Sequence, residues 1–293
     1  MLLALLLGLA VHFLYEDEET AAGIDWVATN LLRIGVALLG LRIAFGDILA
    51  NGIVGPGVVI AAMVATFAVG TIFASISGLS NAFGRLSAGA VAVCGVSAAI
   101  AISAVLPKRK SGDEELAVVV ISVTALSTIA MIVYPVISSA FTFDDYAAGV
   151  FIGGSIHDVA QVVGAGYSIS DEAGDTATYI KLMRVALLLP IVLLIGLASR
   201  SSVPIERRAP LIPAFLVGFV VLASLNSLGA IPASINTTGT DASRAMLIMS
   251  IFAIGVKSQL KDIFKVGPRP FILIAIETVM MAAVVLIGLS VLH

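Results

Sequence analysis

Four polar side chains lie close together inside one strongly apolar stretch. Residues 151–166 read Phe-Ile-Gly-Gly-Ser-Ile-His-Asp-Val-Ala-Gln-Val-Val-Gly-Ala-Gly, and the polar members are Ser155, His157, Asp158 and Gln161. Ionisable groups inside a membrane segment are costly, so they usually face a cavity or a partner and mark a transport pathway. We therefore expect this stretch to hold a binding site for a small solute or ion.

A second apolar stretch has the same character, with Cys94, Gly95 and Ser97 in a run of alanine and valine. Glycines such as Gly95, and Gly154 in the first stretch, are positions where a helix can break. In lipid, a broken helix is tolerated only where protein or a water-filled cavity satisfies its backbone. The two stretches are therefore predicted to share one polar site.

Each of the segments 86–106 and 147–167 is interpreted as an interrupted helix near the membrane midplane, either crossing the membrane or re-entering it. A half-helix that starts at the midplane directs its free N–H groups and its positive dipole end at whatever sits there. Two such ends predict a site for a small oxyanion, with hydrogen bonds from Ser97, Ser155 and Gln161. The alternative is that these serines, like Cys94, are small packing residues at helix contacts.

Lys181 and Arg184 are the basic residues of the next apolar segment. Either cation can balance the charge of a bound anion. The alternatives are that they snorkel toward the membrane surface, or that they pair with acids such as Asp175.

His157 and Asp158 are the ionisable pair of the first stretch. An unperturbed histidine titrates near neutral pH, so His157 can couple substrate movement to a proton. Asp158 can be hydrogen-bonded into the break or carry the proton itself. Adjacent side chains point about 100° apart on a regular helix, so we do not expect a catalytic His–Asp pair. A structural role in holding the broken segment together stays open.

The composition indicates a membrane protein. The 293 residues are 59% hydrophobic and 12% charged, with a mean hydropathy of +1.11, whereas a soluble domain carries about 25% charged residues. The small net charge of -3 argues against nucleic acid as a partner, and a single cysteine excludes a disulfide within the chain. Three histidines and no Cys-x-x-Cys pair predict no metal site. No nucleotide-binding motif is present, so no cofactor is expected.

About ten apolar segments of membrane scale follow one another, which predicts an all-α integral membrane protein with one transmembrane domain over 1–293. The acidic stretch 168–175 is expected to be a loop. The segments are expected at residues 1–14, 25–50, 53–77, 86–106, 116–139, 147–167, 179–199, 211–231, 243–264 and 271–292.

An internal repeat relates segments 31–77 and 246–292, as is common in secondary transporters. If the basic loops 108–110, 200–208 and 257–269 are assigned to the cytoplasm, the two copies are inverted. The first basic residue of each copy lies near a helix end and is expected to snorkel. Five residues match at one offset, with Gly40, Arg42, Asp47, Ile48 and Gly52 falling on Gly255, Lys257, Asp262, Ile263 and Gly267.

The motifs resemble those of the YeiH-type sulfate exporter family of bacteria and archaea. The resemblance covers nearly the whole chain in the right order, although family members usually have another hydrophobic helix before the segment at Met1. The matching stretches are 153–166 with Lys181, Leu182, Arg184 and Val185, then Cys94–Ala98, Leu31–Arg42, Leu225–Gly229 and the motif at Gly255.

The resemblance implies a multi-pass protein of the prokaryotic inner membrane, similar to inverted-repeat transporters. We expect a secondary transporter that exports a small anion such as sulfate or sulfite. Its expected partners are the lipid bilayer, that anion and a coupling proton or sodium ion, with a homodimer left open. The alternative is a cation–proton antiporter that uses Asp158 and His157. A membrane-embedded enzyme is the weakest reading, since no nucleophile–base pair is apparent.

The predicted substrate-binding residues come from both interrupted segments and from the basic pair, and no catalytic or metal-binding residue is predicted. They are Cys94, Gly95, Ser97, Gly154, Ser155, His157, Asp158, Gln161, Lys181 and Arg184.

Overall fold

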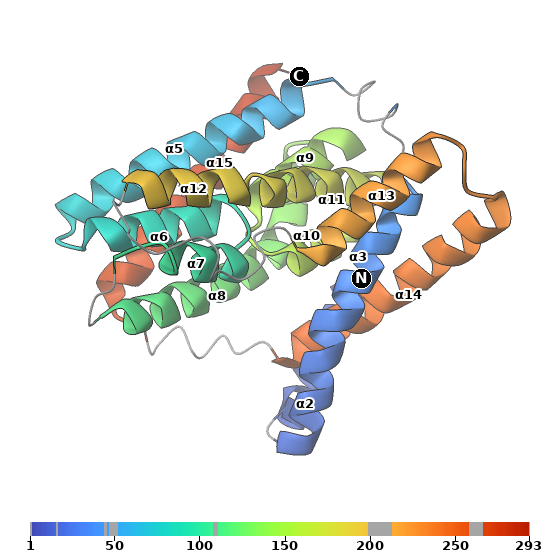
Figure 1. Cartoon of the computed structure of the whole chain (residues 1–293), viewed down its shortest axis with the longest axis horizontal. Helices are drawn as coiled ribbons and strands as arrows, with labels where there is room; N and C mark the ends of the chain where they lie inside the picture. Colours follow the sequence, from blue (N-terminus) through green and yellow to red (C-terminus); the bar gives the residue numbers. More distant parts are fainter. Residues whose placement is uncertain are drawn as a thin grey trace.

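The computed structural model describes residues 2–15, 17–43, 46, 52–107, 111–198, 213–257 and 266–292 (Figure 1). All regular secondary structure in these ranges is helical, as predicted. The α-helices are α1 (Leu2–Ala10), α2 (Glu18–Trp26), α3 (Leu32–Leu38), α5 (Val54–Ile76), α6 (Asn81–Ala92), α7 (Val96–Ser103), α8 (Gly112–Ala140), α9 (Asp145–Ser155), α10 (Val159–Ile169), α11 (Asp171–Ala186), α12 (Leu188–Ala198), α13 (Ala214–Ser227), α14 (Ala233–Lys257) and α15 (Pro268–Leu292). Short 3₁₀ or π turns flank α2 and α3 at η1 (His12–Tyr15), η2 (Val27–Leu31) and η3 (Leu39–Leu41).

Six helical stretches in the described residues are long and apolar enough to cross a membrane. Many of their large apolar side chains point outward, as lipid requires, with Val64, Leu194 and Val279 each about two-thirds exposed. The chain is therefore a multi-pass, all-α membrane protein. The six are Thr20–Leu41, Val54–Ile76, Gly112–Ala140, Asp171–Ala198, Ala233–Lys257 and Pro268–Val291, and two shorter apolar helices are Val159–Ile169 and Ala214–Ser227.

The helices pack in two groups. In the first group α14 packs against α1, η2 and α3, and α3 also packs against α13. In the second group α5 packs against α6 and α15, while α11 packs against α9 and α10. The groups meet mainly where α10 contacts α14 and α1. Figure 1 shows α2, α3, α13 and α14 together on the right, with α5, α6, α8 and α15 on the left.

Glycines allow close packing inside the first group. A Cβ added at Gly255 of α14 would lie 2.3 Å from the Leu5 carbonyl oxygen of α1. A Cβ added at Gly40 would lie 2.4 Å from the Phe219 carbonyl oxygen of α13. Small residues let helix backbones approach in lipid, where no hydrophobic force holds helices together. Gly40 and Gly255, which match in the sequence repeat, therefore each lie against the backbone of a neighbouring helix.

Two of the expected boundaries were wrong. Residues 168–175 are not a loop, since α11 begins at Asp171, and the Ser170 hydroxyl accepts a hydrogen bond from Ala173 N at 3.0 Å. Acidic residues are favourable in a first helical turn, so the acidic stretch starts this helix. Helix α14 begins at Ala233, ten residues before the expected 243. The Thr237 hydroxyl donates to the Ala233 carbonyl at 2.9 Å, which satisfies this polar side chain within the helix.

Several expectations fall on parts of the chain outside the described residues. These include the basic segments 108–110 and 200–208, and the matched repeat positions Asp47, Ile48, Asp262 and Ile263.

Candidate functional site

Two helix breaks lie at the positions expected from the sequence. Helix α6 ends at Ala92 and α7 begins at Val96, while α9 ends at Ser155 and α10 begins at Val159. Gly95 in the first break has a φ of 62° and a ψ of -121°, a backbone conformation that essentially only glycine adopts.

The two breaks touch each other. A Cβ added at Gly95 would lie 3.7 Å from both Cβ and the carbonyl oxygen of His157. The broken segments, about 60 residues apart in sequence, therefore meet at one crossing point.

Arg184 of α11 binds the carbonyl ends of both first half-helices. Its Nε and Nη2 donate to Ala92 O at 3.0 Å and Val91 O at 2.8 Å, at the end of α6. Its Nη1 donates to Gly153 O and Ile156 O, both at 2.9 Å, at the end of α9. The last carbonyls of a helix lack partners within it and carry its negative dipole end, so a buried cation satisfies both needs.

Lys181 acts at the same point, one helical turn earlier. Its Nζ donates to Val93 O at 2.7 Å and to Ile156 O at 3.0 Å. Both Lys181 and Arg184 are fully buried, so neither snorkels. Nor do they pair with Asp175, which instead binds Arg42. Both structural alternatives considered for the two cations were thus wrong, because the breaks themselves supply their acceptors.

The second half-helices begin on the other side of the crossing. The Asp158 carboxylate caps α10, accepting from Ala160 N at 3.1 Å, and Asp158 N donates to the Ser127 hydroxyl of α8 at 3.2 Å. Helix α7, by contrast, has no side-chain cap at its N-terminus, since its N-cap residue is Gly95. The N–H groups in the first turn of α7 are therefore left for a ligand, apart from that of Ala98, which faces the Cys94 thiol.

A cavity of about 1260 Å³ lies at the starts of α7 and α10, between the two helix groups. Four predicted site residues line it: Cys94, Ser97, Asp158 and Gln161. Gln161 is 2% exposed, and its Oε1 makes no hydrogen bond with any described residue. A buried amide oxygen without a partner is unfavourable, and a hydrogen-bond donor that reaches this side chain would satisfy it.

The other predicted site residues lie away from this cavity. Ser155 donates to Phe151 O at 2.5 Å within its own helix, and the nearest atoms to a Cβ at Gly154 belong to Val59 and Val285. His157 Nε2 lies 2.9 Å from the Thr278 hydroxyl oxygen of α15. Gly154, Ser155 and His157 therefore pack on the side of the crossing away from the cavity, as the structural alternatives for Ser155 and His157 expect.

The first helix group lines the opposite wall, which the sequence reasoning did not identify. Arg33 and Lys257 line the cavity there, together with Tyr15. Lys257 Nζ binds Asp25 Oδ1 at 2.6 Å, and the Tyr15 hydroxyl lies 3.2 Å from both oxygens of Asp25. Burial raises the pKa of Tyr15, Lys257 opposes this rise, and Asp25 adds to it. The sequence shows Arg33 as a charge within an apolar segment, but it does not show which residues share the cavity with Arg33.

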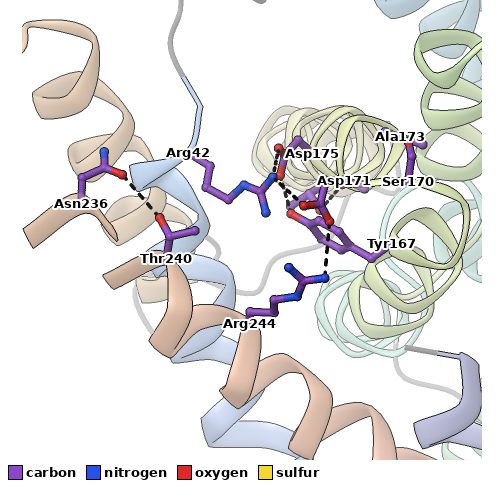
Figure 2. Close-up of polar contacts among 11 residues, drawn as sticks. Arg42, Tyr167, Ser170, Asp171, Ala173, Asp175, Asn236, Thr240 and Arg244 are labelled. Carbon is purple, nitrogen blue, oxygen red and sulfur yellow. Dashed lines mark hydrogen bonds and ion pairs between the residues drawn. The ribbon is translucent and has the colours of Figure 1, made fainter. Parts of the chain in front are cut away.

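A polar cluster joins the two helix groups elsewhere (Figure 2). Arg42, just after η3, binds Asp175 at 3.0 Å and Asp171 at 3.6 Å, both in α11. The Arg42 guanidinium also lies 5.7 Å from the Tyr167 ring centre, and the Tyr167 hydroxyl donates to Asp175. Arg244 of α14 adds a longer contact of 3.9 Å to Asp171. Arg42 therefore binds across the groups and does not snorkel, since two carboxylates lie within reach.

This architecture defines a class of protein: a multi-pass helical membrane protein with two crossing helix breaks beside a cavity. The chain belongs to the family described as conserved hypothetical protein 698, whose model matches residues 1–274. The predicted membership in the YeiH-type family is thereby confirmed.

Named relatives align along nearly the whole chain. The UPF0324 membrane protein TauZ of Paracoccus denitrificans is 48% identical over 297 residues, covering 100% of this chain and 88% of its own length. The UPF0324 membrane protein CT0845 of Chlorobaculum tepidum is 46% identical, covering 98% of this chain and 81% of its own length. The UPF0324 membrane protein RB0971 of Rhizobium meliloti is 45% identical, covering 99% and 85%. No solved structure matches the chain.

Proposed function

We propose that this protein is a secondary transporter that exports a small inorganic or sulfur-containing anion, such as sulfate or sulfite, by alternating access. The observation that carries this proposal is the cavity at the crossing, which the starts of α7 and α10 line together with Ser97 and Gln161. Convergent polar groups in an otherwise apolar cavity are typical of a solute site.

The charge at the crossing favours an anion. The two fully buried cations Lys181 and Arg184 are bound to carbonyl oxygens, and no described carboxylate forms an ion pair with either. Asp158 is the single acidic residue in the two breaks. Neither cation lines the cavity, so each acts on an anion at α7 through the intervening protein, whose low dielectric strengthens the attraction.

The two half-helices offer different groups to that anion. At α7 the free N–H groups and the exposed Ser97 hydroxyl can donate hydrogen bonds. At α10 the Asp158 carboxylate already occupies the N-terminus. We therefore place the anion against α7, with the amide nitrogen of Gln161 as a further donor.

Alternating access requires that the two helix groups move relative to each other. The Arg42 cluster connects them, and Arg244 in that cluster lies 13 residues before the cavity residue Lys257 on α14, or about 20 Å along the helix. We propose that the cluster closes one end of the pathway while the cavity remains at the other. Together with α1, α13 and the two broken pairs, the six long spans make the ten segments we propose, with α3–α5 and α14–α15 as inverted repeat copies.

The second candidate function is cation–proton antiport. Its support is that Asp158 lines the cavity, where a carboxylate can bind a cation or a proton. His157 does not line this cavity, so the antiport mechanism would depend on Asp158 alone. Asp158→Asn separates the candidates, because it abolishes cation–proton exchange and leaves an anion site at α7 in place.

Flux into proteoliposomes tests the proposal directly. Radiolabelled sulfate and sulfite uptake is measured with and without a pH gradient for the wild type, Ser97→Ala and Gln161→Ala. Saturable uptake that both substitutions reduce at least tenfold supports the anion carrier. Ser103→Ala is the matched control, because Ser103 lies on α7 outside the cavity lining and donates to Ile100 O. Absence of uptake of either anion, with proton movement on adding sodium, overturns the anion proposal in favour of antiport.

A further inference from the structure

Glu277 is a fully buried carboxyl group in the middle of the span α15. The Ser87 hydroxyl of α6 donates to its Oε1 at 2.8 Å. Its Oε2 is buried as well and makes no hydrogen bond with any described residue. A Cβ added at Gly70 of α5 would lie 2.3 Å from Oε1, so only a glycine leaves room for this carboxyl. The carboxyl group is therefore enclosed by three helices and lies away from the cavity wall.

No described cation forms an ion pair with this carboxyl. Helix α5 has no titratable side chain, and α6 has only Arg85. Helices α8 and α9 contribute three acids near the start of α8 and the pair Asp145 and Tyr146 at the start of α9, with Tyr134 further along α8. None of these groups forms an ion pair or hydrogen bond with Glu277 in the described part of the chain. An ionised carboxylate buried without a cation is costly, and a protonated carboxylic acid removes that cost.

The next residue connects this position to the helix breaks. The Thr278 hydroxyl lies 2.8 Å from Ile274 O and 2.9 Å from His157 Nε2, so it connects the histidine ring to the backbone of α15. His157 in turn sits in the break that touches Gly95. A shift of α15 against α6 thus acts on Glu277 and on the crossing together.

We propose that Glu277 is a proton-binding site within the membrane, independent of which solute the cavity carries. In this conformation its carboxyl group holds a proton on Oε2 while Oε1 accepts from Ser87. When α6 and α15 separate, water reaches the carboxyl, the O–H bond breaks and the proton passes to water, leaving the carboxylate. Proton binding at Glu277 would then couple to movement of the breaks through Thr278 and His157.

Infrared spectroscopy of the purified protein in liposomes tests this site. At neutral pH the wild type should show the carbonyl stretching band of a protonated carboxylic acid, and Glu277→Gln should lose it. Glu172→Gln is the control, because Glu172 is exposed in the first turn of α11 and its substitution should leave the band in place. Ser87→Ala should shift the band by removing the hydrogen bond to Oε1. An unchanged band in Glu277→Gln overturns the proposal.

A second measurement uses only the wild-type protein, so its result does not depend on whether a variant folds. In wild-type protein labelled with ¹³C-glutamate, one carboxyl signal should have the chemical shift of the protonated form at neutral pH. Glu277 is the single glutamate that is fully buried among the described residues, so this signal identifies it. Carboxylate shifts for every glutamate would overturn the proposal. Both measurements are independent of flux, so they decide the proton site even if neither sulfate nor sulfite is transported.

Discussion

Lys181 and Arg184 share one acceptor, because Lys181 Nζ lies 3.0 Å and Arg184 Nη1 lies 2.9 Å from the carbonyl oxygen of Ile156. Two like charges on one oxygen repel each other, so the contact persists only because each cation also binds the end of α6. The pair therefore holds the ends of both first half-helices at a fixed separation. A site built on the second half-helices depends on this arrangement.

Removing the guanidinium should destabilise the protein strongly. Hydrogen bonds from a charged donor contribute about 1.5–3 kcal/mol each, and Arg184 makes four of them to backbone carbonyls. We expect Arg184→Ala to lower the free energy of unfolding by several kcal/mol, and Arg184→Lys to recover part of it. The measurement is the thermal melting temperature in detergent. Arg244→Ala is the control, since the Arg244 side chain is 62% exposed. A melting temperature for Arg184→Ala equal to that of the wild type would contradict the structural role of Arg184.

Gly95→Ala should also destabilise the crossing, for a different reason. Space is available at Gly95, because the nearest atoms to an added Cβ are 3.7 Å away. The cost comes from the backbone conformation, and holding a non-glycine residue there costs about 1–3 kcal/mol. We expect a lower melting temperature and reduced flux. Gly57→Ala in α5, which has no neighbour within 4 Å and an ordinary helical backbone, should leave both unchanged or slightly raise stability.

The ion pair between Arg42 and Asp175 should control the balance between conformations. A half-buried pair of this kind contributes about 1 kcal/mol, which is roughly a fivefold change in population. Cys94 is the single cysteine and lines the cavity, so its reaction rate with a membrane-impermeant maleimide reports the conformation with that cavity. We expect Arg42→Ala and Asp175→Asn each to slow labelling, by at most about fivefold.

The double variant distinguishes a shared contact from two separate effects. If Arg42 and Asp175 act through one ion pair, combining the substitutions should slow labelling no more than either one alone. Additive effects, or no effect of either change, would argue against a closed contact between the helix groups.

The close contact between α1 and α14 gives a further test of the packing. An alanine Cβ at Gly255 would lie 2.3 Å from the Leu5 carbonyl oxygen, so the two helices would have to move apart. Gly255→Ala should therefore lower the melting temperature. In the same assay Gly23→Ala of α2, with no neighbour within 4 Å, should raise it slightly, because alanine is favoured over glycine in a helix by about 0.5–1 kcal/mol. A melting temperature for Gly255→Ala at or above wild type would mean that this contact is looser than the structure shows.

The sequence by itself determined the membrane class, the long spans and the places where helices break. These features are local: apolar length decides whether a segment can span, and glycines beside polar residues decide where it can break. The expectation for residues 168–175 failed for a local reason as well, because acidic residues suit the first turn of a helix as much as a loop.

The tertiary structure decided what the polar residues bind. Arg184 and its acceptor Ala92 are 92 residues apart, and Glu277 and Ser87 are 190 apart, so no local pattern connects them. The same holds for the adjacent residues His157 and Asp158, which lie on opposite sides of the crossing, one against Thr278 and the other in the cavity. Which side chain meets water, lipid or a backbone carbonyl depends on how helices distant in sequence pack, and hydrophobicity in lipid does not specify that packing.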